Sequence, residues 1–238
     1  MAQLTLIRHG QASLGADDYD QLSDHGYWQS TALGAHFATG RVAFDRCVSG
    51  TLKRQRQTAK TVLDELPDIH RAVSEHAGFN EYETQPVFSR YMPPLLAADS
   101  ELREIFHADR AASRDNREVS RRVFFPVLNA WLADAGRADL GFENFLQFKA
   151  RVAAALSQTA DNAKPGENVA VFTSSGVIAV AALLALNLPD SAFADVGWHI
   201  HNASVTRLAV EHGRFGLIQF NATMHLEATG RNDALTWL

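Results

Sequence analysis

The sequence predicts a three-layer α/β/α fold with a mostly parallel central sheet and a helical insertion. Three segments, beginning near Leu4, Phe44 and Val169, share one order: a short apolar run ends in polar residues and a helical pattern follows. Alternating buried strands and helices are typical of parallel α/β sheets. The 238 residues fit a single domain, 1–238, with an inserted cap-like segment at about 78–142.

The first of these units places polar residues at the end of a strand. The apolar run Leu4 to Ile7 ends at Arg8-His9-Gly10. Because ligands of α/β sheets bind at the carboxyl ends of the strands, this tripeptide is expected at a site. Ser23 is predicted to cap a helix that reaches about Phe37.

The other predicted elements follow from periodicity and from turn residues. In chain order they are a strand Phe44 to Ser49, a helix Leu52 to Leu66 ended by Pro67, a helix Glu143 to Ala160, a strand Val169 to Phe172, a helix Val177 to Leu186, and strands Ser204 to Val210 and Phe215 to Phe220.

The pattern weakens between residues 78 and 142, which we interpret as an inserted subdomain. Its prolines are expected to interrupt mostly helical pieces, and the charged run Arg110 to Arg122 is expected to form a solvated helix. Its aromatic residues either line a pocket for a less polar substrate or pack the insertion, with packing favoured; they include Phe79, Tyr82, Phe88 and Tyr91.

Composition restricts the classes of function. A net charge of −5 and a pI near 6.0 argue against nucleic acid or an anionic membrane as partner. No apolar run approaches the ~20 residues of a membrane span, and the start of the chain lacks signal-peptide features, so we expect a cytoplasmic location. Cys47 is expected to be a small buried residue, and no spacing of metal ligands or cofactor motif is present. No feature indicates the oligomeric state.

Two strand ends carry residues suited to phosphoryl chemistry. Arg8 is a cation that can bind oxyanions in bidentate fashion, and a neutral His9 can act as a nucleophile. After the second strand, cations begin a helix, where an anion also gains from the helix N-terminus. Arg54 and Arg56 are two residues apart and point differently, so only one is expected to enter the site.

In this order the motifs resemble the histidine phosphatase superfamily, which includes cofactor-dependent phosphoglycerate mutases and many phosphomonoesterases. The resemblance runs nearly end to end and implies a phosphoglycerate mutase-like fold. It is carried by Leu6 to Gln11, Leu22 to Gly26 with Gln29, Ser49 to Arg54 with Gln57 to Ala59, Asn80-Glu81, Glu143 with Phe145 and Arg151-Val152, Gly176 to Ile178, and Asn221 with His225-Leu226.

The resemblance implies a role for each of these residues. His9 would become phosphorylated, Arg8 and Arg54 would bind the phosphoryl oxygens, and Glu81 would protonate the leaving oxygen, with Glu83 as a nearby alternative. Phosphoryl transfer needs such positioning and charge neutralisation. The implied partner is a small phosphorylated substrate, with little or no requirement for metal.

One position departs from the family pattern. Most members carry a second histidine after the later strand, and here Ser174 occupies its place. A serine hydroxyl and helix-terminal amides can still donate to a phosphoryl oxygen. Losing one charged hydrogen bond of ~1.5–3 kcal/mol would slow turnover roughly tenfold to a hundredfold. His199, His201 or His225 could enter the site, although alternation along a strand favours structural roles for the first two.

Three functions are therefore compatible with the sequence. The leading hypothesis is a phosphomonoester hydrolase that acts through a phosphohistidine on His9, with activity reduced by the serine. The first alternative, motivated by Ser174, is a non-catalytic or weakly active binder of phosphorylated ligands. The second alternative is a phosphoglycerate mutase, which is disfavoured because Gly15 stands near the place of an asparagine in mutases. The leaving group is not indicated.

Overall fold

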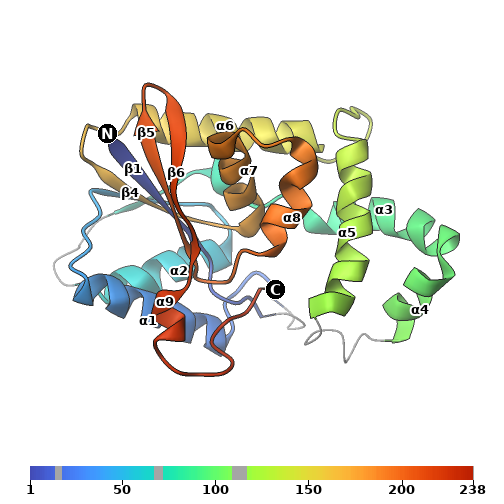
Figure 1. Ribbon diagram of the computed structural model, residues 1–238, viewed down its shortest axis with the longest axis horizontal. Coiled ribbons are helices and arrows are strands. Elements are labelled where there is room, and N and C mark those ends of the chain that lie inside the picture. Colours follow the sequence, from blue (N-terminus) through green and yellow to red (C-terminus); the bar gives the residue numbers. More distant parts are fainter. Residues whose placement is uncertain (14–17, 67–71, 109–116, 238) are drawn as a thin grey trace.

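The computed structural model describes all residues except 14–17, 67–71, 109–116 and 238. Within the described residues one six-stranded sheet has the order β3-β2-β4-β1-β5-β6 (Figure 1). Strands β3, β2, β4 and β1 are parallel, and β5 and β6 are added antiparallel. The strands are β1 (Ala2–Arg8), β2 (Arg46–Ser49), β3 (Val73–Glu75), β4 (Asn168–Thr173), β5 (Val205–Glu211) and β6 (Arg214–Ala222). The predicted α/β class and mostly parallel sheet are confirmed; β3 was not predicted.

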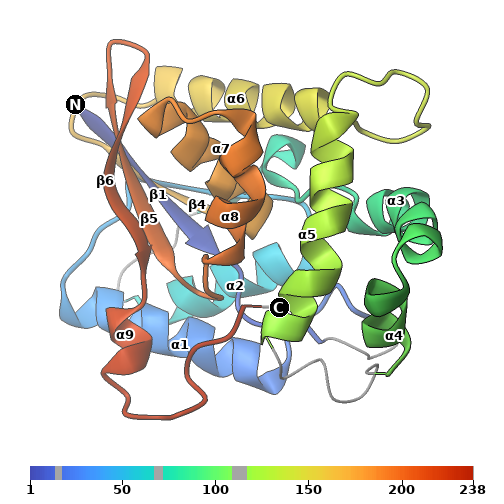
Figure 2. The same cartoon turned by 45° about the vertical axis from the view of Figure 1, so that its right-hand side comes forward.

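Helices cover both faces of the sheet, which confirms the three layers (Figures 1 and 2). One face carries α1 (Asp24–Thr39), α2 (Lys53–Asp64) and α9 (Met224–Glu227). The other carries α6 (Phe145–Asp161), α7 (Ser175–Leu186) and α8 (Phe193–Trp198), with the 3-10 turn η3 (Asp190–Ala192) before α8. Ser23 caps α1 as predicted, because its hydroxyl accepts from Gly26 N at 3.0 Å.

Alternation along β4 divides the core between these two layers. Val169 and Val171 pack toward α6 and α7, whereas Ala170 and Phe172 pack toward α1 and α2. Cys47 is only 3% exposed and packs with Ala170 and Phe172 on the side of α1 and α2, as expected for a small buried residue.

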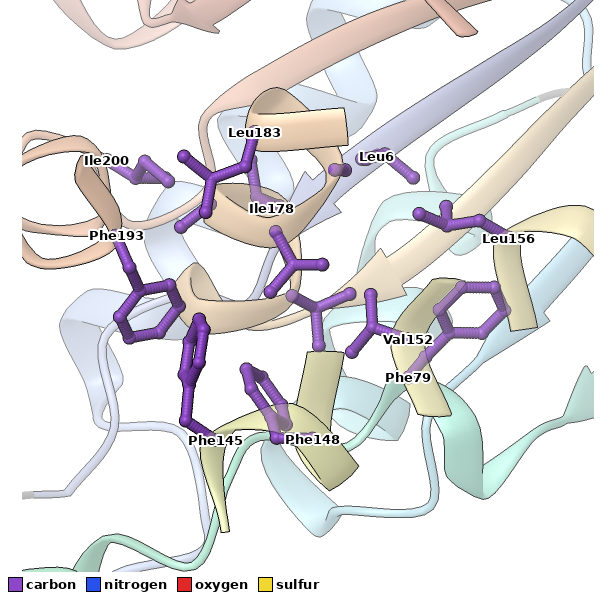
Figure 3. Close-up of a cluster of buried hydrophobic side chains, with 14 of the residues drawn as sticks. Leu6, Phe79, Phe145, Phe148, Val152, Leu156, Ile178, Leu183, Phe193 and Ile200 are labelled. Atoms are coloured by element: carbon purple, nitrogen blue, oxygen red, sulfur yellow. The ribbon is translucent and has the colours of Figure 1, made fainter. Parts of the chain in front are cut away.

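On the other side of the sheet, the core cluster that contains Val169 and Val171 joins α6, α7 and α8. Figure 3 shows the rings of Phe145 and Phe148 from α6 beside Phe193 from α8, with Ile178 of α7 next to them. All four side chains are at most 2% exposed. Tight packing of this kind gives α7 a fixed position relative to α6.

The segment interpreted above as an insertion is mostly helical where it is described, and it lies at one end of the sheet (Figure 1). It contains the 3-10 turn η1 (Ala77–Phe79), α3 (Thr84–Ala98), α4 (Ser100–Ala108) and α5 (Arg117–Ala133). The expectation that its prolines interrupt helices is wrong for Pro93, Pro94 and Pro126, which lie inside α3 and α5. Each removes one backbone donor, but the buried faces of both helices outweigh this loss.

The structure describes only the last part, from Arg117, of the segment that was predicted to form a solvated helix. Its residues from Arg117 onward begin α5, and Arg121 and Arg122 form exposed ion pairs with Asp195 and Glu101. Residues 110–116, Pro67 and Gly15 lie outside the described residues. No helix among the described residues has the length and apolarity needed to cross a membrane.

Candidate active site

The site forms where three neighbouring strands end. Arg8 of β1 pairs with Thr173 of β4, so His9 and Ser174 are the next residues at the same edge. His9 N donates to Thr173 O at 2.9 Å, and Gly50 N, after β2, donates to Phe172 O at 3.0 Å. Parallel pairing therefore brings together residues that are more than a hundred positions apart in the sequence.

His9 is buried in its neutral form, with one tautomer defined by its contacts. Its Nδ1 lies 2.7 Å from Gly10 O, which can only accept, so Nδ1 carries the proton. Its Nε2 accepts from Arg54 Nε at 3.1 Å. Burial, followed by the charges of Arg54 and Arg8, holds the pKa of His9 well below 6.5. Nε2 is thus unprotonated at neutral pH, and its lone pair accepts the hydrogen bond from Arg54.

Arg54 is the cation of α2 that enters the site. It is 8% exposed, and its Nη1 lies 2.7 Å from Asp20 Oδ1. The side chain of Arg56 is 51% exposed and reaches Glu75 instead. The two arginines thus point in different directions, as predicted, and Arg54 is the one that contacts His9. Asp20 also accepts from Lys53 N at 2.8 Å, so a carboxylate already occupies the N-terminus of α2.

Arg8 is buried and held by backbone carbonyls. Its Nη1 donates to Ile200 O and its Nη2 to Trp237 O, the latter at 2.8 Å. Burial lowers the pKa of Arg8 to about 10, with Glu81 acting in the opposite direction, so the side chain stays charged at neutral pH. Within the described residues its Nε is buried without a hydrogen-bond partner, so this N–H can donate to an oxyanion.

Glu81 lies at the N-terminus of α7. Its Oε2 accepts from Gly176 N at 3.0 Å and from Ser175 Oγ at 3.3 Å. A Cβ atom on Gly176 would lie 2.1 Å from Glu81 Oε1, so it would displace the carboxylate from this position. Glu83 instead precedes α3, is exposed, and accepts from Glu143 N at 3.4 Å. The charge of Glu81 also acts on Arg8.

Ser174 is fully buried beside Gln55 of α2. Its Oγ accepts from Gln55 Nε2 at 2.8 Å, and the same Nε2 donates to Phe79 O at 2.9 Å. Gln55 Oε1 accepts from Leu52 N at 3.3 Å, so the side of the amide that faces Ser174 is the donor Nε2, which cannot accept the hydroxyl proton of the serine. Ser174 does not cap α7 through its side chain. Its hydroxyl proton therefore remains available to a ligand.

The three histidines considered as substitutes have other contacts. His199 and His201 lie in the turn between α8 and β5, so the predicted alternation along a strand is wrong. Their rings contact Arg117 and Asn221, respectively. His225 stacks against His36 with ring centroids 5.8 Å apart. The turn after α8 follows from the end of that helix at Trp198, which sequence periodicity did not indicate.

Several residues that shape the site were not identified from the sequence. They are Asp20, Gln55 and the C-terminal segment, where Gln29 binds Ala234 O and Thr236 Oγ1. Figure 2 shows the C-terminus beside the start of α5, where Arg117 lies over the ring of Trp237 at 5.0 Å. In the described parts of the chain no group of three or more His, Cys, Asp or Glu side chains could hold a metal ion.

Comparison with known proteins defines the family. The family model for the histidine phosphatase superfamily (branch 1) matches residues 4–90 and 82–223. The chain belongs to this superfamily, and we class it as a phosphatase. No curated protein sequence matches the chain significantly.

Solved structures support the same fold. A histidine-to-alanine variant of phosphoserine phosphatase from Entamoeba histolytica, in complex with phosphoserine, is 17% identical with a TM-score of 0.63; the match covers 95% of this chain and 100% of that one. A mycobacterial glucosyl-3-phosphoglycerate phosphatase in complex with VO3 is 20% identical with a TM-score of 0.62, covering 94% and 100%. At these identities the likeness establishes the phosphoglycerate mutase-like fold.

Proposed function

We propose that the protein hydrolyses small phosphate monoesters through a phosphohistidine formed at Nε2 of His9. The observation that carries this proposal is the buried, neutral imidazole whose Nε2 faces Arg54 at 3.1 Å. A proton on Nδ1, held by Gly10 O, leaves the Nε2 lone pair for phosphorus. In the free enzyme Arg54 Nε donates a hydrogen bond to this lone pair. When substrate binds, a phosphoryl oxygen accepts that hydrogen bond instead, and the lone pair of Nε2 becomes free to attack.

The arginines supply the charge that the transferred group requires. Arg8 and Arg54 both contribute to lowering the pKa of His9, which places their charges close to its ring. These two cations neutralise the equatorial oxygens in the transition state, and the hydroxyl of Ser174 donates a further hydrogen bond. The α7 N-terminus adds its partial positive charge.

Glu81 serves as the proton donor and then as the base. In the first step the bond from His9 Nε2 to phosphorus forms, the ester bond breaks, and the leaving oxygen takes the proton of Glu81. In the second step water attacks phosphorus, its proton passes to the Glu81 carboxylate, and inorganic phosphate leaves neutral His9. The Glu81 carboxylate lies beside Gly176 N, at the sheet edge where His9 lies, and this position supports the role of Glu81 as acid and base.

The insertion forms the other side of the proposed substrate site. We propose that residues 78–142 are a cap inserted into one domain, 1–238, and that this cap selects the leaving group. Similar structures include a phosphoserine phosphatase and a glucosyl-3-phosphoglycerate phosphatase, which supports small phosphorylated substrates as a class.

Turnover assays test the proposal directly. Para-nitrophenyl phosphate and common sugar phosphates are incubated with the wild type, His9→Ala and Arg54→Ala, with chelator present. We expect turnover that is lost in both variants. Arg56→Ala is the matched control, because it removes an exposed cation from the same helix. Equal activity of wild type and His9→Ala would refute the proposal.

A second function is motivated by Ser174, which is fully buried and which the family resemblance places where most members carry a second histidine. It is a non-catalytic binder of phosphorylated ligands that retains the pocket of Arg8 and Arg54. Calorimetry with inorganic phosphate separates the two: tight binding without turnover supports the binder, whereas burst phosphorylation of His9 excludes it. Isomer exchange between phosphoglycerates would instead support a mutase.

A further inference from the structure

The loop that carries Glu81 has little secondary structure of its own. It follows the short turn η1 and precedes α3, and the carbonyls of Phe79 and Asn80 accept hydrogen bonds from side chains of other elements. Such a loop needs other groups to satisfy its backbone and to fix its path. The position of an acid on a loop of this kind depends on whatever holds the loop.

One guanidinium from α6 holds this loop. Arg151 Nη1 lies 3.2 Å from Ala77 O, 3.0 Å from Gly78 O and 3.0 Å from Asn80 O. The last of these carbonyls belongs to the peptide bond that leads directly into Glu81. A single cation therefore fixes the backbone on the N-terminal side of the acid.

Arg151 is itself fixed by a carboxylate. Its Nε and Nη2 donate to the two oxygens of Glu143, each at 2.7 Å, in a bidentate pair. The two side chains are 27% and 19% exposed, so the pair is mostly shielded from water. Geometry of this kind restricts the guanidinium plane as well as its position. The remaining Nη1 is left directed at the loop.

Other contacts join the same loop to the rest of the site. Asn80 Oδ1 accepts from Thr51 N at 2.7 Å, and a Cβ on Gly78 would meet the Cβ of Ala155 in α6 at 2.5 Å. The loop is thus pressed against α6 on one side and tied to the start of α2 on the other. Arg151 is the charged member of this set.

We propose that Arg151, oriented by Glu143, is a positioning residue for the acid step, because it holds the Asn80 carbonyl and so aims the Glu81 carboxyl at the leaving oxygen. This inference rests on the proposed function. Misplacing a reacting group by about 1 Å can slow a reaction on the order of a hundredfold. In kcat/KM, which covers the steps up to phosphorylation of His9, the effect falls on protonation of the leaving oxygen by Glu81 and spares the attack by His9.

The dependence of rate on the leaving group provides the test. A nitrophenolate leaves without protonation, whereas an alkyl oxygen requires the acid. We expect Arg151→Met to lower kcat/KM for an alkyl phosphate such as β-glycerophosphate about tenfold to a hundredfold, and to change that for para-nitrophenyl phosphate by less than about threefold. Glu81→Gln should give the same selective pattern, and Glu143→Gln a weaker form of it.

A matched control and the folding state separate this role from general stabilisation. Lys149→Met removes another partly buried ion pair from α6, that with Asp190, which does not touch the loop. It should affect both substrates equally. If Arg151→Met does not fold, Glu143→Gln carries the test alone.

Two further outcomes would overturn separate claims. An equal loss for both substrates in the Arg151 and Glu143 variants, with an active wild type, would overturn this inference and leave the proposed function intact. Absence of turnover that depends on His9 in the wild type would overturn the proposed function and this inference with it.

Discussion

The hydrogen bond from Gln55 to Ser174 predicts how the serine takes part in catalysis. Gln55 Nε2 uses its two protons on Phe79 O and Ser174 Oγ, so the serine must direct its own proton elsewhere. We expect this proton to reach a phosphoryl oxygen. Ser174→Ala removes the donor, and Gln55→Met removes the group that orients it.

The magnitudes follow from the type of hydrogen bond. A donor to a charged phosphoryl oxygen contributes about 1.5–3 kcal/mol, so Ser174→Ala should lower kcat about tenfold to a hundredfold. Gln55→Met should cost less, and the two should couple by about 1 kcal/mol, roughly a fivefold effect. In Gln55→Met, Phe79 O loses the hydrogen bond from Gln55 but still accepts one from Thr173 Oγ1 at 2.7 Å, so this carbonyl stays satisfied.

The assay is a double-mutant cycle on kcat with para-nitrophenyl phosphate. Most of the effect of Gln55→Met should disappear in the Ser174→Ala background. Gln57→Met is the matched control, because this amide lies on the same helix but accepts from Leu22 N; its effect should add to that of the serine variant. Independent effects of Gln55 and Ser174, or an unchanged kcat for Ser174→Ala, would refute the reasoning.

Two further predictions concern Gly176 and His225. Gly176→Ala places a Cβ 2.1 Å from Glu81 Oε1 and should lower the turnover of alkyl phosphates about a hundredfold, whereas Gly197→Ala, with 3.6 Å of clearance, should have little effect. Burial lowers the pKa of His225 to about 4 from its ordinary 6.5, so the unfolded chain binds the proton first and stability falls as pH drops through this window. His225→Asn should therefore lose about 2–3 kcal/mol less stability than the wild type between pH values of about 7 and 4.5, as measured by urea unfolding. Parallel pH profiles of wild type and variant would contradict this assignment.

The strand ends could be predicted because they depend on local patterns. The apolar run before Arg8 and the helix after Ser49 each follow from a few neighbouring residues, and parallel pairing then brings their ends together. The separation of Arg54 from Arg56 also follows from helix geometry alone. The roles of His9, Arg8, Arg54, Glu81 and Ser174 remain predictions.

Contacts between single polar residues could not be predicted in the same way. Asp20 reaches Arg54 from a loop, and Trp237 O reaches Arg8 across nearly the whole chain. Neither contact leaves a periodic or spaced signal, because each depends on the tertiary path of an irregular segment. The prolines of α3 and α5 were misjudged for a related reason: burial of one helix face outweighs the loss of a few backbone bonds.

Trapping of the covalent intermediate tests the central claim most directly. The protein is mixed with a radiolabelled phosphomonoester, quenched within one turnover and digested, and the peptide that contains His9 is isolated. We predict label on this peptide that is stable in alkali and lost in acid, as a phosphoramidate bond requires, and no label in His9→Gln. Turnover of the substrate with no label on His9, or with label on another residue, would contradict the account.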